Sequence, residues 1–271
     1  MTNVALKLFF IFMIASGSFL NLCSGDAFDF SSGLFDPQGK IRQIDYARKA
    51  TERGSTLIGL CAGSNVVLAC FKETDEERQY YPEESIWMLE DNLGVAGVGL
   101  RSDVQYLIQV AQQECLQHVY AWGTPIHPKR LGMELAETLR KRAGRASKRP
   151  LAAILFIAGS KTPNNAPRLY VTGTEGNFLE CQAISAGRLQ GECMKYLKAN
   201  QQTFSQASCK ADLIQMALRT LEHVAVGVSV DDLHSSDLQI GTISEGEPFR
   251  IYETEDIEHA IQQLKKQNAA Q

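Results

Sequence analysis

The sequence has none of the features that divide a chain into several units. After residue 27 it contains no long run of proline, glycine or serine and no low-complexity segment. It also has no internal repeat of about 20 to 50 residues, the period typical of solenoids and propellers. Hydrophobic residues make up 44% and charged residues 21% of its 271 residues, as in an ordinary globular protein. One folded domain with short extensions is predicted.

The patterns of metal-binding and nucleic-acid-binding proteins are also missing. A formal net charge of −4 argues against nucleic-acid binding through bulk electrostatics. No two histidines have the spacing of zinc ligands, so no metal and no cofactor is expected. The five histidines are His118, His127, His223, His234 and His259.

Cysteine pairs of the C-x-x-C kind are absent. The seven cysteines are scattered and mostly lie in apolar runs, which favours buried thiols in a reducing compartment over a disulfide framework or a zinc site. They are Cys23, Cys61, Cys70, Cys115, Cys181, Cys193 and Cys209.

The N-terminal segment conflicts with a reducing compartment. Lys7 precedes an apolar run at residues 8–20, and small residues such as Ser24 and Gly25 follow it. This is the shape of a secretory signal peptide, and the run is too short for a comfortable membrane span. Residues 1–27 are therefore interpreted as an apolar extension or a signal-like segment. One hypothesis is a start codon assigned too far upstream or an unprocessed extension, and the other is export.

Hydrophobic periodicity predicts groups of strands alternating with groups of helices. A first helix is expected at residues 41–53, ended by Gly54, and a second at 102–120, with Ser102 as its N-cap. The apolar positions of this second helix run from Val104 to Val119 at helical spacing. A third helix carries Leu131 to Ala143 on one side.

The remaining helices and strands are predicted from the same hydrophobic periodicities. Strands are expected at 55–61, 65–71, 86–89, 93–98, 151–158, 168–172, 178–184, 238–243 and 248–252, and further helices at 192–198, 211–224 and 255–267. A sheet covered by its own helices and stacked on a second such sheet gives an α+β fold, a four-layer α/β/β/α sandwich.

Three stretches, Phe35–Ala47, Val98–Asp103 and Arg149–Gly159, resemble the α subunits of the 20S proteasome. Phe35–Ala47 reads FDPQGKIRQIDYA and is similar to the family signature S-P-x-G-R-x-x-Q-x-E-Y-A, with Asp36 in place of the usual serine. Val98–Asp103 reads VGLRSD where the family carries a G-L-x-A-D turn. Arg149–Pro150, followed by LFIAG at 155–159, resembles a family strand. The resemblance covers residues 28–262 as one domain and leaves a polar tail at 263–271.

Among the α types, the type-1 subunit, also called α6, is the most similar. The similarity lies in Gln38–Ile41, Glu114–Leu116 and Phe178–Ala183. The resemblance implies the N-terminal nucleophile hydrolase fold and a subunit of a heptameric outer ring in the cytoplasm and nucleus, with a secretory route as a minor alternative. Its implied partners are other α subunits, β-ring subunits and the C-terminal tails of a regulatory particle or activator, without nucleic acid and without a membrane in the assembled state.

The resemblance also raises the question of catalysis at Ser55. Catalytic members of this fold use an N-terminal hydroxyl residue whose free amine, or a nearby lysine, manages the proton. Ser55 stands in register with that nucleophile, but it follows a predicted helix, so its nitrogen is an amide. The aspartate position falls near Phe71, the lysine position falls at 85–87, and no lysine occurs between Lys72 and Lys129. A non-catalytic subunit is expected. The alternative is a hydrolase activated by cleavage before Ser55.

Three groups of site residues are implied by the resemblance, for a chain that takes part in ubiquitin-dependent and ATP-dependent protein degradation as a structural and gating subunit. Lys72 would pair with the C-terminal carboxylate of an activator tail, or would be a solvated lysine at the end of a strand. Phe28, Asp29 and Phe30 would contribute to the gate. The first helix and the turn before it would contact the ring neighbour through Pro37, Gly39, Gln43 and Tyr46.

A run of basic residues between 140 and 149 contains no acid. It could bind phosphate or nucleic acid, but cations at the end of a helix also complement the helix dipole, and this second interpretation is favoured. The residues are Arg140, Lys141, Arg142, Arg145, Lys148 and Arg149.

Overall fold

Two antiparallel five-stranded sheets form the centre of the protein. A computed structural model describes residues 33–71, 84–145, 148–162, 164–201, 204, 209–224 and 234–269. The first sheet has the order β10-β9-β2-β1-β8 and the second has the order β3-β4-β5-β6-β7. The strands are β1 Thr56–Ala62, β2 Asn65–Phe71, β3 Ile86–Glu90, β4 Leu93–Gly99, β5 Ala153–Gly159, β6 Arg168–Thr172, β7 Phe178–Cys181, β8 Ala183–Ala186, β9 Leu238–Ser244 and β10 Arg250–Ile251.

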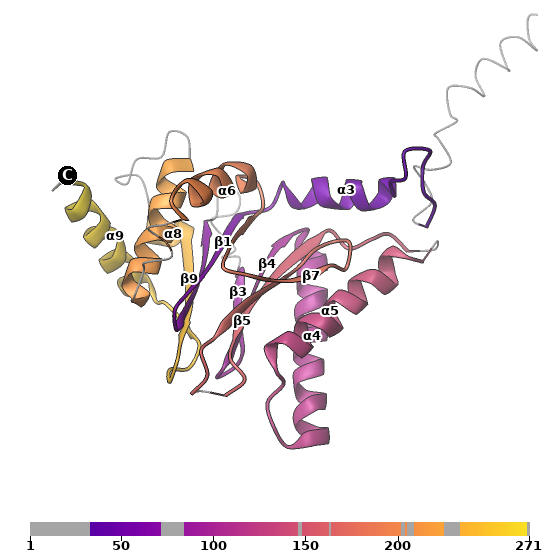
Figure 1. Cartoon of the computed structure of the whole chain (residues 1–271), viewed down its shortest axis with the longest axis horizontal. Coiled ribbons are helices and arrows are strands. Elements are labelled where there is room, and N and C mark those ends of the chain that lie inside the picture. The colour runs from indigo at the N-terminus through magenta and orange to yellow at the C-terminus, as the bar shows by residue number, and fades with distance from the viewer. Residues whose placement is uncertain are drawn as a thin grey trace, which may run out of the picture.

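Helices cover the outer face of each sheet (Figure 1). Helices α6, α8 and α9 lie on the first sheet, α4 and α5 lie on the second, and α3 crosses one end of the sandwich. The helices are α3 Arg42–Thr51, α4 Arg101–Trp122, α5 Pro128–Ala143, α6 Gln190–Ala199, α8 Lys210–Val224 and α9 Thr254–Ala269, with a short 3-10 turn η3 Ser235–Asp237. These layers confirm the predicted α+β fold, a four-layer α/β/β/α sandwich.

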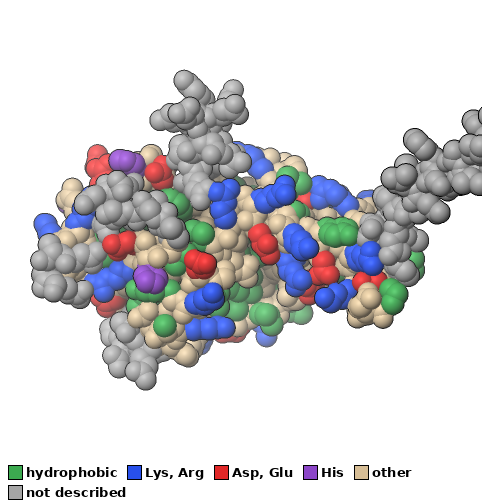
Figure 2. All heavy atoms as spheres, turned by 90° about the horizontal axis from the view of Figure 1, so that it is seen from above, with side chains coloured by type: hydrophobic (Ala, Val, Ile, Leu, Met, Phe, Trp, Pro, Cys, Tyr) green, Lys and Arg blue, Asp and Glu red, His purple; other side chains and the backbone are tan. Residues whose placement is uncertain are grey.

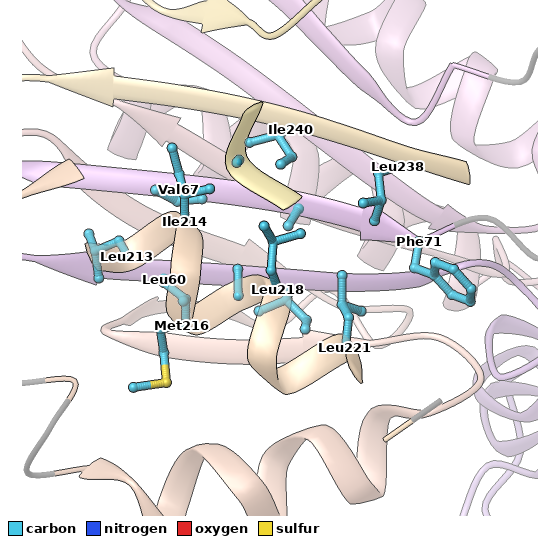
Figure 3. Packing of buried hydrophobic residues seen from close by; sticks show 14 of the residues in the cluster. Leu60, Val67, Phe71, Leu213, Ile214, Met216, Leu218, Leu221, Leu238 and Ile240 are labelled. Carbon is cyan, nitrogen blue, oxygen red and sulfur yellow. The ribbon is translucent and has the colours of Figure 1, made fainter. Parts of the chain in front are cut away.

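The strands are apolar on both faces because each sheet is covered by helices on one face and by the other sheet on the opposite face. In β1, Ile58 and Leu60 pack under the helices, whereas Leu57 faces the other sheet. Figure 3 shows Leu60 and Val67 of the first sheet beside Leu218 of α8. Fully burying a leucine contributes roughly 1.5–3 kcal/mol, so the three apolar clusters, one under each helical layer and one between the sheets, stabilise all four layers.

One predicted strand is wrong. The run at 178–184 was expected to form a single strand, but β7 pairs with β6 in the second sheet and β8 pairs with β1 in the first. The chain passes between the sheets at Gln182, whose carbonyl accepts a hydrogen bond from the Cys61 N–H at 2.6 Å. Because no glycine or proline marks this crossing, the sequence pattern reads as one continuous strand.

The predicted helix ends also need correction. Helix α4 begins at Arg101, so its N-cap is Leu100 rather than Ser102, and no side chain caps it. Helix α3 ends at Thr51 with Glu52 as its C-cap, before Gly54. Helix α9 extends from Thr254 to Ala269, close to the predicted 255–267, and its Leu264 is fully buried against the first sheet and its helices.

Two negative findings apply to the described part of the chain. None of its helices combines the length and the apolarity that a membrane span requires. Its His, Cys, Asp and Glu side chains form no group of three or more that could hold a metal ion.

Candidate functional site

Ser55 lies between the end of α3 and the start of β1, and its backbone is tightly enclosed. A Cβ atom on Gly187 would lie 2.0 Å from the Ser55 carbonyl oxygen, and one on Gly54 would lie 2.9 Å from the backbone nitrogen of Gly99. The N–H of Arg188 donates to the Gly54 carbonyl at 3.3 Å. The chain therefore enters β1 as a packed, continuous peptide, and the nitrogen of Ser55 is an amide.

A hollow of about 380 Å³ opens beside Ser55. It is lined by the end of α3, the starts of β1 and β3, the end of β4 and the first turns of α4. Residues 50–55, around the end of α3, meet residues 84–105 of the β3–β4 hairpin and the start of α4 here. Its size falls within the ~300–1,000 Å³ range of small-molecule pockets.

Among the described residues, the positions of the catalytic aspartate and lysine expected of a hydrolase hold other side chains. Phe71, near the position of the catalytic aspartate, is 93% buried in the apolar cluster under the helices. Positions 85–87 hold Ser85, Ile86 and Trp87, and the described residues that line the hollow include no lysine. At these positions Ser55 therefore has neither the aspartate nor the lysine that a catalytic member of this fold uses.

The turn before α3 is organised by Asp36, one of the residues that depart from the family signature. Its carboxylate accepts hydrogen bonds from the N–H groups of Gln38 at 3.0 Å and Lys40 at 2.9 Å. The Lys40 N–H is the main cause of a lowered pKa of Asp36. Burial opposes this effect, and Arg42, 3.4 Å away, and the Gln38 N–H lower the pKa further. Gly39 completes the turn with a φ of +78°. A carboxylate here can therefore do what a serine hydroxyl does in a turn.

The structure locates one group of predicted site residues and leaves two outside its described part. Pro37 and Gly39 are exposed in the turn, and on α3 the side chain of Gln43 is half-buried and that of Tyr46 is 46% exposed. Lys72 and the segment Phe28, Asp29 and Phe30 lie outside the described residues.

Sequence reasoning did not identify the exposed apolar end of α4. Leu116 is 72%, Tyr120 94% and Trp122 67% exposed, and this end projects past the strands (Figure 1). Val119, expected on the buried face, is 43% exposed because the sheet does not reach this far. From Gln105 to Trp122 the helix carries a single acidic residue, Glu114, and no lysine or arginine. Such a face is typical of a surface that another protein covers.

The basic run belongs to the end of α5, as predicted from the helix dipole. Arg140, Lys141 and Arg142 form its last turn, and the guanidinium of Arg142 lies 4.6 Å from the centroid of the Tyr106 ring on α4. Figure 2 shows acidic side chains interspersed among the lysines and arginines on the face that carries α3. This mixture does not form the continuous basic stripe typical of nucleic-acid binding.

Most of the described cysteines are buried thiols, as predicted. Cys61, Cys70, Cys115 and Cys193 are buried and Cys181 is half-buried, and none of the described cysteines is in a disulfide. Burial, together with the nearby Glu90 carboxylate, raises the pKa of the Cys115 thiol to about 12. Cys209, at the start of α8, is the exception because it is exposed.

Comparison with known proteins agrees with this architecture. The family profile described as "Proteasome subunit" matches residues 51–243, more than two thirds of the chain. The chain therefore belongs to the proteasome subunit family. Within that family it groups with the α subunits of the 20S proteasome.

Three relatives illustrate the grouping. The chain is 28% identical over 240 residues to "Proteasome subunit alpha type-1" of Dictyostelium discoideum, covering 89% of this chain and 95% of the relative. It is 28% identical over 247 residues to "Probable proteasome subunit alpha type-6" of Schizosaccharomyces pombe, covering 91% and 86%. It is 30% identical over 175 residues to "Proteasome subunit alpha 1" of Haloferax volcanii, covering 64% and 69%.

Proposed function

We propose that this chain is a non-catalytic structural and gating subunit of the outer α ring of the 20S proteasome core. The observation that carries the proposal is the continuity of α3 with β1 at Ser55, where Gly187 and Gly99 hold the backbone on both sides. A nucleophile in this position has an amide nitrogen and no neighbouring lysine among the described residues. The chain would then act as a folded sandwich whose exposed surfaces contact other subunits. The assembled particle is proposed to be located in the cytoplasm and nucleus.

The proposed partners are the other α subunits, the subunits of a β ring, and the C-terminal tails of a regulator. The apolar end of α4 supports assembly because Tyr120 and Trp122 would otherwise remain in water. The turn and helix with Pro37, Gly39, Gln43 and Tyr46 are proposed to contact the neighbouring α subunit. Phe28, Asp29 and Phe30 are proposed to contribute to the gate, and Lys72 to the pocket for an activator tail.

Size-exclusion chromatography of the co-expressed α subunits tests this function. The chain is expected to elute in a ring-sized particle with the other subunits and, when expressed alone, to be aggregated or self-associated. Elution of the isolated chain as a well-behaved monomer of 30.0 kDa would count against the proposal.

The alternative is a hydrolase matured by cleavage before Ser55. Its test is a chain that begins at Ser55, produced by cleavage of a fusion protein and assayed on fluorogenic peptides in the assembled particle. We expect no hydrolysis by this subunit, because positions 71 and 85–87 would still lack the aspartate and the lysine of a catalytic member of the fold. Hydrolysis that disappears in Ser55→Ala would support the alternative.

A further inference from the structure

The first turn of α5 is capped by a histidine. Pro128, the first residue of the helix, has no N–H, so the first N–H group of α5 belongs to Lys129. That N–H donates to Nδ1 of His127 at 3.1 Å. The carbonyl oxygen of His127 also accepts from the N–H groups of Arg130 at 2.8 Å and Leu131 at 3.1 Å. His127 therefore holds the start of the helix through both its ring and its backbone.

The ring can accept this hydrogen bond only while it is neutral. A neutral imidazole has one nitrogen that accepts and one that donates, whereas both nitrogens of the protonated ring carry a hydrogen. A protonated His127 would turn an N–H of its own toward the N–H of Lys129, and the cap would be lost. The proton would also add a positive charge at the N-terminus of a 16-residue helix, where the helix dipole is already positive.

The surroundings of His127 also disfavour the protonated form. Burial lowers the pKa of His127 from its ordinary value of 6.5, and the positive charges of Lys161, just after β5, and of Lys129 lower it further. The unfolded chain therefore binds this proton more readily than the folded chain does. The stability that the cap contributes is fully present above pH 6.5 and is lost as the pH falls through the lowered pKa.

Other polar contacts of the loop between α4 and α5 respond differently to acid. Nδ1 of His118 lies 2.9 Å from the carbonyl oxygen of Thr124. Because a carbonyl oxygen only accepts, this nitrogen carries a hydrogen in both charge states of the ring, and protonation leaves the bond in place. The N–H of Ile126 donates to the carboxyl group of Glu90, which can accept in either charge state. Among these three contacts, the acid-sensitive one is therefore the cap of α5.

From these contacts we propose that His127 is a proton-sensitive cap, which fixes the junction between the α4–α5 loop and α5 at neutral pH and releases it in acid. Histidine suits this role because its charge ordinarily changes between pH 5 and 8. The contacts of Thr124 and Ile126 persist when the ring is protonated. The opening is therefore confined to the junction and leaves the rest of the domain folded.

Melting temperatures of the full chain, in the oligomeric state in which it is purified, test the proposal at pH 7.5 and pH 5.0. Asparagine and serine are good helix caps that do not titrate, so His127→Asn and His127→Ser keep the cap at both pH values. Between these pH values the parent is expected to lose about 2–4 °C more than either variant, the shift that loss of one cap produces in a chain of this size. The control His259→Asn, at an exposed position of α9, should lose as much as the parent.

A local measurement separates release of the cap from a general effect of acid. Hydrogen exchange followed by mass spectrometry reports exchange at C2 of each imidazole ring, which gives the pKa of that ring, and exchange of the backbone amides. We expect the pKa of His127 to lie below 6.5. After correction for the intrinsic pH dependence, the amides of residues 129–131 should lose about fivefold of their protection at pH 5.0 in the parent and none in His127→Asn.

Three outcomes would overturn the proposal. The first is an equal loss of melting temperature in the parent and in both cap variants. The second is a pKa of His127 at or above 6.5, and the third is unchanged protection of the amides of residues 129–131 in the parent. Because each protein is compared with itself at the two pH values, a variant that is less stable at both of them still decides the question.

Discussion

Arg149 holds Asp103 in a two-pronged ion pair at the point where α4 begins. Nη1 of Arg149 lies 2.6 Å from Oδ2 of Asp103, and Nη2 lies 2.8 Å from Oδ1. The N–H of Ala152 also donates to Oδ2 at 2.8 Å, and the N–H of Leu100 donates to the Ala152 carbonyl at 2.8 Å. The start of α4 and the segment leading into β5 are therefore fastened together next to the hollow.

Removing the charge of Asp103 should destabilise the fold. Asp103 is 4% exposed, and hydrogen bonds to a charged group contribute about 1.5–3 kcal/mol, so Asp103→Asn is expected to lower the free energy of unfolding by about 2 kcal/mol. Urea denaturation measures the change. The control is Asp256→Asn, which breaks a surface pair with Arg250 and is expected to cost less than about 1 kcal/mol. Equal losses in the two variants would show that the Asp103 pair is no stronger than a surface contact.

The ion pair between Asp103 and Arg149 also makes the free energy of unfolding depend on pH. Burial alone would raise the pKa of Asp103, but the Arg149 guanidinium and the Ala152 N–H outweigh it and hold that pKa below its ordinary value of 3.8. The folded state thus keeps the carboxylate ionised at pH values where the unfolded chain is already protonated. Its stabilising contribution is present above pH 3.8 and is lost as the pH falls through the lowered pKa. Unfolding free energies measured at decreasing pH should therefore converge between the parent and Asp103→Asn.

Glu90 should have the opposite effect. Its Oε2 atom is buried and, among the described residues, has no hydrogen-bond partner. Burial raises the pKa of Glu90 above its ordinary 4.5, against opposing effects of His118 and the Ile126 N–H. The protonated form therefore stabilises the fold at low pH, and this contribution is lost as the pH rises through the raised pKa. Glu90→Gln should become more stable relative to the parent as the pH rises from 4.5 to neutral. The exposed Glu245→Gln, which makes the same chemical change at the surface, serves as the control.

Gly187 tests the enclosure of Ser55. Both Gly187, with φ of +96°, and Gly246, with φ of +82°, adopt a backbone conformation that disfavours other residues. An alanine Cβ at 246 meets nothing within 4 Å, whereas one at 187 would lie 2.0 Å from the Ser55 carbonyl oxygen. Gly246→Ala should cost about 1–2 kcal/mol from backbone strain alone, and Gly187→Ala clearly more. Thermal unfolding of the two variants compares them, and similar melting temperatures would mean that Ser55 is not tightly held.

Tyr120 tests the proposed assembly surface. Because this side chain is 94% exposed, Tyr120→Ser should change the free energy of unfolding by less than about 0.5 kcal/mol. As a large aromatic group in a covered interface, however, it should be needed for assembly, with a loss of affinity of about fivefold or more. The fraction of chain recovered in the co-expressed ring particle measures this. The exposed Gln112→Ser, about two turns earlier on α4, should leave that fraction unchanged. An equal yield for both variants would exclude this end of α4 as a contact.

Much of the fold could be predicted from the sequence because the signals were local. Runs such as Val66 to Cys70 are apolar at every position, as expected for a strand that is buried on both faces of its sheet. The helical spacing from Val104 to Cys115 likewise predicts the buried face of α4. Alignment of the sequence with the motifs of the proteasome family then placed Ser55 at the start of a strand.

The features that the sequence did not predict depend on contacts between distant segments of the chain. The change of sheet at Gln182 follows from pairing with two different strands, which no local pattern records. The exposure of Val119 depends on where the sheet ends beneath α4. The hollow exists only because Arg53, Ser85 and Arg101 meet in space, so neither its volume nor its charge could be predicted.

The most direct test of the central claim is native mass spectrometry of the particle isolated through a tag on this chain, followed by release and mass measurement of the subunit. We predict a multi-subunit particle far heavier than the 30.0 kDa of one chain, from which the released subunit still contains α3 ahead of Ser55. A monomer, or a released subunit that begins at Ser55, would contradict the proposal of a non-catalytic ring subunit.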